Sequence, residues 1–169
     1  MEQLVLFNDK PKRPRTRPNR PQEFKVVALR DCPAPDRLIS CEKPEQAADY
    51  WRAFIATAPW HTPQQECLVA ILLNTRRKIL GHHLVGIGTL DSVLIHPREV
   101  FRAAVVAAAH SVIIMHNHPG GDPSPSAADI RVTRELIRAS RVLQIDIVDH
   151  VVMGNPNHYS LREYGFFYD

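Results

Sequence analysis

The chain has 169 residues, 44% of them hydrophobic and 23% charged, and its formal net charge is +3. This length suits one domain with a buried core, and no apolar run approaches the roughly 18 residues that a transmembrane helix needs. We therefore expect a folded protein with no membrane contact.

The N-terminus and the cysteine content favour a cytoplasmic protein. Residues 1–9 contain neither the basic start nor the cleavage pattern of a secretory signal. The three cysteines, Cys32, Cys41 and Cys67, are odd in number and form no C-x-x-C pair. Reduced thiols in the cytoplasm fit this pattern better than a disulfide framework does.

Positive charge is concentrated in the segment from Lys10 to Arg20, which holds six Lys and Arg residues and no acid. Prolines are spaced through this segment, so we expect a disordered tail over residues 1–22, followed by a folded domain over residues 23–169. Two roles stay open for the tail. It could be a solubilising linker, or it could bind the phosphate backbone of nucleic acid.

The first half of the domain has the pattern of a strand, a helix and a hairpin. We predict a strand over residues 24–30 and a helix that begins near Pro44 and ends before Pro59. The nearly continuous apolar run at residues 66–73 predicts a central strand. After a turn, residues 78–85 should run back as the second strand of the hairpin.

The second half alternates between helices and strands. A helix that begins at Pro97 should bury one apolar stripe, made of Val100, Phe101, Ala104 and Val105. Further on we predict a buried strand at residues 111–115, a helix at residues 126–139, and strands at residues 144–152 and 159–161. Strands mixed with three helices predict the α/β class, with a mixed β-sheet sandwiched by helices.

The stretch from His116 to Asp129 carries the candidate chemistry. His116 and His118 end the preceding apolar strand and, as alternate strand residues, share one face, while Asn117 points the other way. A Pro- and Gly-rich loop then turns the chain toward Ser126 and Asp129 at the start of the next helix. Two histidines, one carboxylate and a position left to water make up the ligand set of a catalytic zinc site.

Each candidate residue also has a structural interpretation. A Ser-x-x-Asp pattern before an apolar helix resembles a capping box, so Ser126 and Asp129 alone would be capping residues. Glu66 alone would be a solvated strand end. The two upstream histidines favour the metal-site interpretation instead. Among the other histidines only His150, next to Asp149, is a candidate for lining the site or for packing behind it.

The same stretch resembles the JAMM motif of the MPN/JAB metalloprotease superfamily, which is His-x-His-Pro, six residues, then Ser-x-x-Asp, with a Glu from an earlier strand. Here six residues separate Pro119 from Ser126, and Asp129 completes the pattern. The flanking segments are similar to the bacterial RadC-like (UPF0758) branch: Gly88 to Ser92, His96 to Phe101, and Asp149-His150. The resemblance covers roughly residues 44–165 and implies a cytidine-deaminase-like fold.

By this resemblance, His116, His118 and Asp129 would bind Zn2+, and Glu66 would be the catalytic glutamate. Zinc would lower the pKa of its bound water toward ~7, and Glu66 would act as the general base. Ser126 would donate a hydrogen bond to the developing oxyanion. The expected reaction is hydrolysis of a peptide or isopeptide bond in a protein or peptide substrate.

Two other classes of function stay open. RadC-like proteins carry a DNA-repair label, so one alternative is a nucleic-acid-binding protein that uses the basic tail from Lys10 to Arg20. The other is a non-catalytic, zinc-stabilised interaction module, in which the metal only holds the loop. The sequence departs from the family pattern at Gly120, where Ser is more common, and this change concerns substrate contacts rather than the metal ligands.

Overall fold

A computed structural model of the chain describes residues 40–88 and 95–167. The predicted basic tail, the predicted strand at residues 24–30 and Cys32 lie outside the described residues, as does most of the connection before Pro97. Within the described part of the chain, no helix is both long and apolar enough to span a bilayer.

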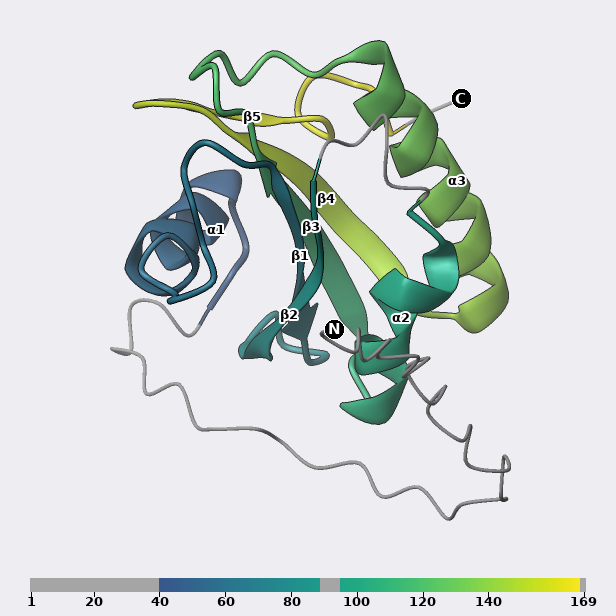
Figure 1. Cartoon of the computed structure of the whole chain (residues 1–169). Helices are drawn as coiled ribbons and strands as arrows, with labels where there is room; N and C mark the ends of the chain where they lie inside the picture. Colours follow the sequence, from purple (N-terminus) through teal and green to yellow (C-terminus); the bar gives the residue numbers. More distant parts are fainter. Residues whose placement is uncertain (1–39, 89–94, 168–169) are drawn as a thin grey trace, which may run out of the picture.

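A five-stranded mixed sheet forms the centre of the domain (Figure 1). Its strands are β1 (Cys67–Leu73), β2 (Ile79–Ile87), β3 (Ser111–Asn117), β4 (Asp146–Met153) and β5 (His158–Ser160). They lie in the order β2-β1-β3-β4-β5. β1 is antiparallel to β2 and to β3, β3 is parallel to β4, and β4 is antiparallel to β5. The predicted mixed sheet, including the hairpin at its start, is therefore confirmed.

Helices cover both faces of this sheet (Figure 1). On one face, α1 (Pro44–Tyr50) begins at the predicted proline and continues directly into a π-helical segment, η2 (Trp51–Ile55). On the other face lie α2 (Pro97–Val106) and α3 (Ala127–Leu143). Parallel strands need a long crossover connection, and α3 supplies it between β3 and β4.

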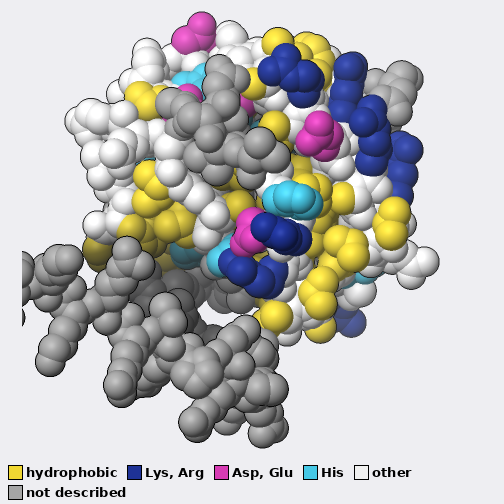
Figure 2. Space-filling model, turned by 45° about the vertical axis from the view of Figure 1, so that its right-hand side comes forward, with side chains coloured by type: hydrophobic (Ala, Val, Ile, Leu, Met, Phe, Trp, Pro, Cys, Tyr) yellow, Lys and Arg dark blue, Asp and Glu magenta, His cyan; other side chains and the backbone are white. Residues whose placement is uncertain are grey.

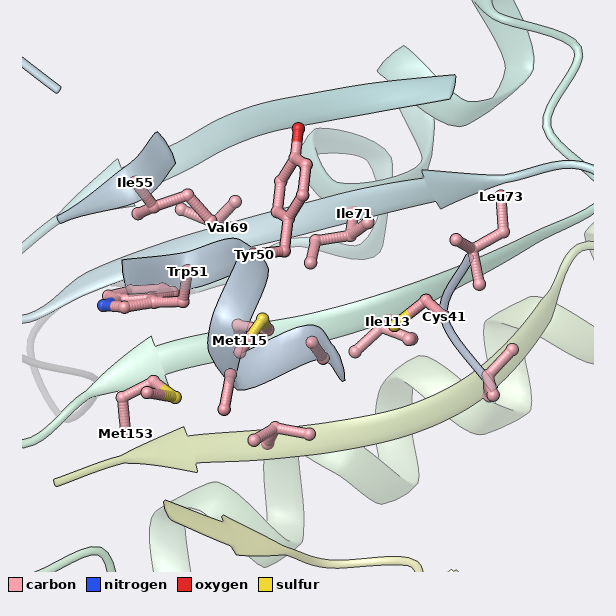
Figure 3. Close-up of a cluster of buried hydrophobic side chains, with 14 of the residues drawn as sticks. Cys41, Tyr50, Trp51, Ile55, Val69, Ile71, Leu73, Ile113, Met115 and Met153 are labelled. Carbon is pink, nitrogen blue, oxygen red and sulfur yellow. The ribbon is translucent and has the colours of Figure 1, made fainter. Parts of the chain in front are cut away.

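Two apolar cores follow from the alternation of side chains along the buried strands. The core under α1 and η2 includes Trp51 together with Val69 and Met115 (Figure 3). The core under α2 and α3 includes Phe101 and Leu136 and uses the opposite face of β1 and β3. β1 is buried along its whole length, as its continuous apolar run predicts.

Two details differ from the predictions. Val105 is 58% exposed, because the buried stripe of α2 is centred on Val100, Phe101 and Ala104 and leaves Val105 beyond its edge. The ends of the elements also shift: β1 begins at Cys67, so that Glu66 lies just before the strand. The ends of elements are less sharply defined than their interiors, so shifts of one or two residues are small differences.

Candidate metal centre

Three of the predicted site residues meet where β3 ends and α3 begins. Nε2 of His116 lies 3.0 Å from Nε2 of His118. Oδ1 of Asp129 lies 3.2 Å from Nε2 of His116, and its Oδ2 lies 3.5 Å from Nε2 of His118. His116 and Asp129 are fully buried, whereas His118 is partly exposed. One ligand atom from each residue lies within 4.8 Å of the others.

The loop that follows His118 is held against the turn between β4 and β5. The backbone N–H of His118 donates to the carbonyl of Met153, and that of Asn155 donates to the carbonyl of Gly121, both at 2.9 Å. Gly121 has φ of +84°, a left-handed conformation that glycine adopts without strain. At Gly154 a Cβ would collide with the carbonyl oxygen of Gly121. Two glycines therefore allow the loop to fold back toward the histidines.

Asp129 is both a capping residue and a member of the cluster. The N–H of Ser126 donates to Oδ2 of Asp129 (2.7 Å), and the N–H of Asp129 donates to Oγ of Ser126 (3.2 Å), which is a capping box. The capping interpretation of this pair is therefore confirmed. It leaves Oδ1 of Asp129 buried without a hydrogen bond, because the 3.2 Å contact with His116 lacks hydrogen-bond geometry. The role of Ser126 as an oxyanion donor stays a prediction.

The cluster holds a buried negative charge. Burial alone would raise the pKa of Asp129, but His116, His118 and the cap from Ser126 outweigh burial and hold that pKa well below its ordinary value. The contact with the Asp129 carboxylate in turn raises the pKa of His118, and the charge of Glu66 adds to this rise. A cation placed among these three side chains would therefore be stabilised.

The donor set fits a zinc ion. Nδ1 of His118 lies 2.9 Å from the carbonyl oxygen of Asp122. A carbonyl can only accept, so this nitrogen carries the proton and a neutral His118 turns the Nε2 lone pair toward the cluster. Nε2 of His116 and the unpaired Oδ1 of Asp129 lie beside it. Imidazole nitrogen and carboxylate oxygen are donors that zinc binds in catalytic sites, with a fourth position left to water.

Behind His116, two buried side chains continue the hydrogen bonding. Nδ1 of His116 lies 2.8 Å from Nε2 of His150, and Nδ1 of His150 lies 2.6 Å from Oγ1 of Thr133. Burial lowers the pKa of His150 well below its ordinary value. His150 thus packs behind the site, which is one of the two roles left open for it. Sequence reasoning missed Thr133, whose signal is its position four residues after Asp129 on α3.

Asp149, the neighbour of His150 in the sequence, directly follows a bulge in β4. Val112 pairs with Ile147, but the next residue of β3 pairs with Asp149, so β4 contains one extra residue at this point. Asp149 then accepts hydrogen bonds from Oγ of Ser160 (2.6 Å) and from the N–H of Arg162 (3.1 Å). Asp149 is therefore a structural carboxylate away from the histidine cluster.

Glu66 is brought toward the cluster by the register of β1 and β3. Leu68 pairs with His116 in this antiparallel pair, so Glu66, two residues earlier, comes level with His118. The effect of the Glu66 charge on the pKa of His118 agrees with this placement. The proposed catalytic role of Glu66 stays a prediction.

The middle residue of the His-x-His pattern holds the chain on both sides of Glu66. Oδ1 of Asn117 accepts a hydrogen bond from the N–H of Cys67, and its Nδ2 donates to the carbonyl of Gln65, both at 3.0 Å. The side chain thus points away from the histidines, as predicted. Its bridge to β1 has no signal in the sequence, because the two segments lie 50 residues apart.

The fold and the site together define a class of protein. A mixed sheet covered by helices carries a His-x-His pair at a strand end, which faces an aspartate on the following helix. This arrangement is consistent with a JAB/MPN domain. A family model described as the RadC-like JAB domain matches residues 41–166. The chain belongs to the RadC-like JAB domain family.

Curated relatives agree with this family. A UPF0758 protein of Chlorobaculum parvum is 49% identical over 100 residues, which make up 59% of this chain and 45% of that protein. A UPF0758 protein of Methanosarcina mazei is 44% identical over 103 residues, 61% of this chain and 45% of the relative. A UPF0758 protein of Shouchella clausii is 46% identical over 104 residues, which make up 62% of this chain and 45% of that protein. The matched region thus spans about half the length of these relatives.

Proposed function

We propose that this domain is a zinc-dependent hydrolase that cleaves a peptide or isopeptide bond in a protein or peptide substrate. The observation that carries the proposal is the convergence of His116, His118 and Asp129, with the buried Oδ1 of Asp129 left without a hydrogen bond. JAB domains are often hydrolytic, which agrees with the proposal. A structural zinc site would normally be closed by four protein ligands, whereas the described residues offer three here.

Each residue of the site has a defined task in this proposal. A bound zinc ion would act as a Lewis acid and lower the pKa of water to near ~7. Glu66, level with His118, accepts the proton of the attacking water and returns it to the leaving nitrogen. Ser126 donates its hydroxyl proton to the oxyanion as charge develops there, while its oxygen continues to cap α3.

The test of the proposal separates proton transfer from metal binding. Glu66→Gln keeps the size of the side chain but removes its basicity, so it should bind zinc as wild type does and lose at least about 100-fold in turnover. Glu163→Gln, at an exposed glutamate in the C-terminal segment, is the matched control and should retain full turnover. Activity is followed by release of new amines from mixed peptides and isopeptide-linked conjugates. Equal turnover by Glu66→Gln and wild type would contradict the proposal.

A second candidate function, binding of nucleic acid, is favoured by a row of arginines on α3. Four exposed arginines at spacings of three and four residues share one side of the helix: Arg131, Arg134, Arg138 and Arg141. Figure 2, which turns the α3 side of the molecule forward, shows a run of Lys and Arg side chains there. None of the four forms an ion pair with another residue in the described part of the chain. Such a row would bind successive phosphates.

The two possible nucleic-acid surfaces, the α3 row and the basic tail, can be tested separately. DNA binding through α3 should survive deletion of residues 1–21, weaken with added salt, and be lost when the four arginines are changed to Gln. Arg98→Gln with Arg102→Gln is the control, because both of these arginines already pair with Glu99. Binding by the full chain that disappears on deletion of the tail would favour the tail instead. Fluorescence anisotropy of a labelled duplex measures all four proteins.

A further inference from the structure

We infer that Thr133, acting through His150, fixes which ring nitrogen of His116 carries the proton, so that Nε2 presents its lone pair to the metal position. The inference deepens the proposed metal site and rests on it. Thr133 and His150 are positioning residues in this account, because neither would touch the metal or the substrate. Three buried hydrogen bonds connect the backbone of Asp129 to His116 through Thr133 and His150.

The direction of the first hydrogen bond is set by a carbonyl. Oγ1 of Thr133 lies 2.6 Å from the backbone oxygen of Asp129, four residues earlier on α3. A carbonyl oxygen can only accept, so the single hydroxyl proton of Thr133 is used in this bond. Toward Nδ1 of His150, at 2.6 Å, the same oxygen can then only accept. Nδ1 of His150 must therefore carry a proton.

The proton on Nδ1 of His150 determines the direction of the next hydrogen bond, between His150 and His116. The residue is fully buried, and burial disfavours a charged imidazole. A neutral ring with its proton on Nδ1 has a lone pair on Nε2. Nδ1 of His116 lies 2.8 Å from that atom and must therefore donate. The remaining ring nitrogen of His116, Nε2, is left with a lone pair beside His118 and Asp129.

The two histidines of the site reach the same tautomer by different means. His118 donates from Nδ1 straight to the carbonyl of Asp122, the kind of partner that metal-binding histidines usually have. His116 instead faces another imidazole. Because an imidazole can either donate or accept, this partner alone does not fix the tautomer of His116. The hydroxyl of Thr133 removes this ambiguity. It also ties His116 on β3 to the backbone of Asp129 on α3, so that two proposed ligands from different elements are linked.

The competing interpretation is that Thr133 only bonds back to its own helix, as threonine often does. Thr57 provides the comparison, since its Oγ1 donates to the carbonyl of Ala53 at 2.9 Å, also four residues earlier, but at an exposed position. If back-bonding were the whole role of Thr133, replacing either threonine by valine would have equally little effect on the metal site.

The first experiment is NMR of the imidazole nitrogens in the full chain after metal has been removed with a chelator. We expect both His116 and His150 to carry a proton on Nδ1 in wild type and in Thr133→Ser, which keeps the hydroxyl. Thr133→Val should change the tautomer of His150 or populate both forms, and Thr57→Val should not. A proton on Nε2 of His150 in wild type, or spectra of Thr133→Val identical to wild type, would overturn the inference.

The second experiment measures zinc affinity by competition with a chelating dye. Thr133→Val should weaken binding by about 10- to 100-fold, the usual effect of losing a partner behind a metal ligand. Thr133→Ser should restore most of the affinity, and Thr57→Val should match wild type. Unchanged affinity in Thr133→Val would contradict the inference. A wild-type chain that binds no zinc would defeat the proposed function, while the tautomers in the metal-free protein would still be measured on their own.

Discussion

At the scale of single residues, Asn117 shows how one side chain can serve a site that it does not enter. Its amide satisfies a buried N–H of β1 and the carbonyl of Gln65, and these two backbone groups flank Glu66. The histidines of the same motif point to the opposite side of β3 and form the cluster. The strand end thus organises two sets of partners at once, through the alternation of its side chains.

Replacing Asn117 should cost more stability than replacing an asparagine whose hydrogen bonds to the backbone are exposed to water. In Asn117→Ala the N–H of Cys67 is left buried without a partner, so the free energy of unfolding should fall by about 2 kcal/mol or more. Asn74 accepts two backbone N–H bonds in the hairpin turn, but water can replace them, so Asn74→Ala should cost less. Urea denaturation measures both variants, and equal losses would contradict the role given to Asn117.

The two described cysteines predict a loss of stability in alkali. Burial raises the pKa of the Cys41 and Cys67 thiols from 9.0 to about 12. Unfolded thiols release protons near pH 9.0 while the folded ones still hold theirs, so between these values the folded state binds more protons. The stability contribution is therefore complete below pH 9 and is lost as the pH rises toward 12. Urea midpoints should fall over this range, and less steeply in Cys41→Ala with Cys67→Ala; identical slopes would refute the assignment.

At the scale of elements, α3 carries much of the site. It supplies Asp129 and its cap in the first turn, Thr133 one turn later, and the row of exposed arginines along its length. The start of this helix could be predicted from Ser126 and Asp129, because a capping box has a local signature. The partner of Thr133 could not, since it depends on the strand register after a bulge in β4, where His150 pairs with Ile114 on the strand that also carries His116.

Ser126 gives a prediction that separates capping from chemistry. Ser126→Ala removes the cap on the N–H of Asp129 and should lower the free energy of unfolding by about 1 kcal/mol. Ser126→Asp can still cap but has no proton to donate, so its stability should stay close to that of wild type while its turnover falls. Thermal and urea unfolding of the two variants, beside an activity assay, make the comparison. A Ser126→Ala chain as stable as wild type would show that the cap contributes little.

At the scale of the whole molecule, the sequence predicts the order of the helices and strands better than it predicts the register in which the strands pair. Continuous apolar runs identify β1 and β3 as strands buried on both faces, and proline marks the starts of α1 and α2. The spacing of the motif likewise predicts that two histidines and an aspartate converge. Strand register and side-chain hydrogen bonds depend on residues far apart in the chain. The roles of Asn117 and Thr133 can therefore be recognised only in the folded sheet.

The proposed function depends on zinc binding by the cluster of His116, His118 and Asp129. Metal content by elemental analysis tests this most directly, on wild type and on His118→Ala purified in the same way. We expect one zinc per wild-type chain and its loss in the variant, because two of the three donors cannot hold the ion on their own. Wild-type protein without bound divalent metal, even after zinc is supplied, would contradict the account and leave Asp129 as a helix cap beside two histidines.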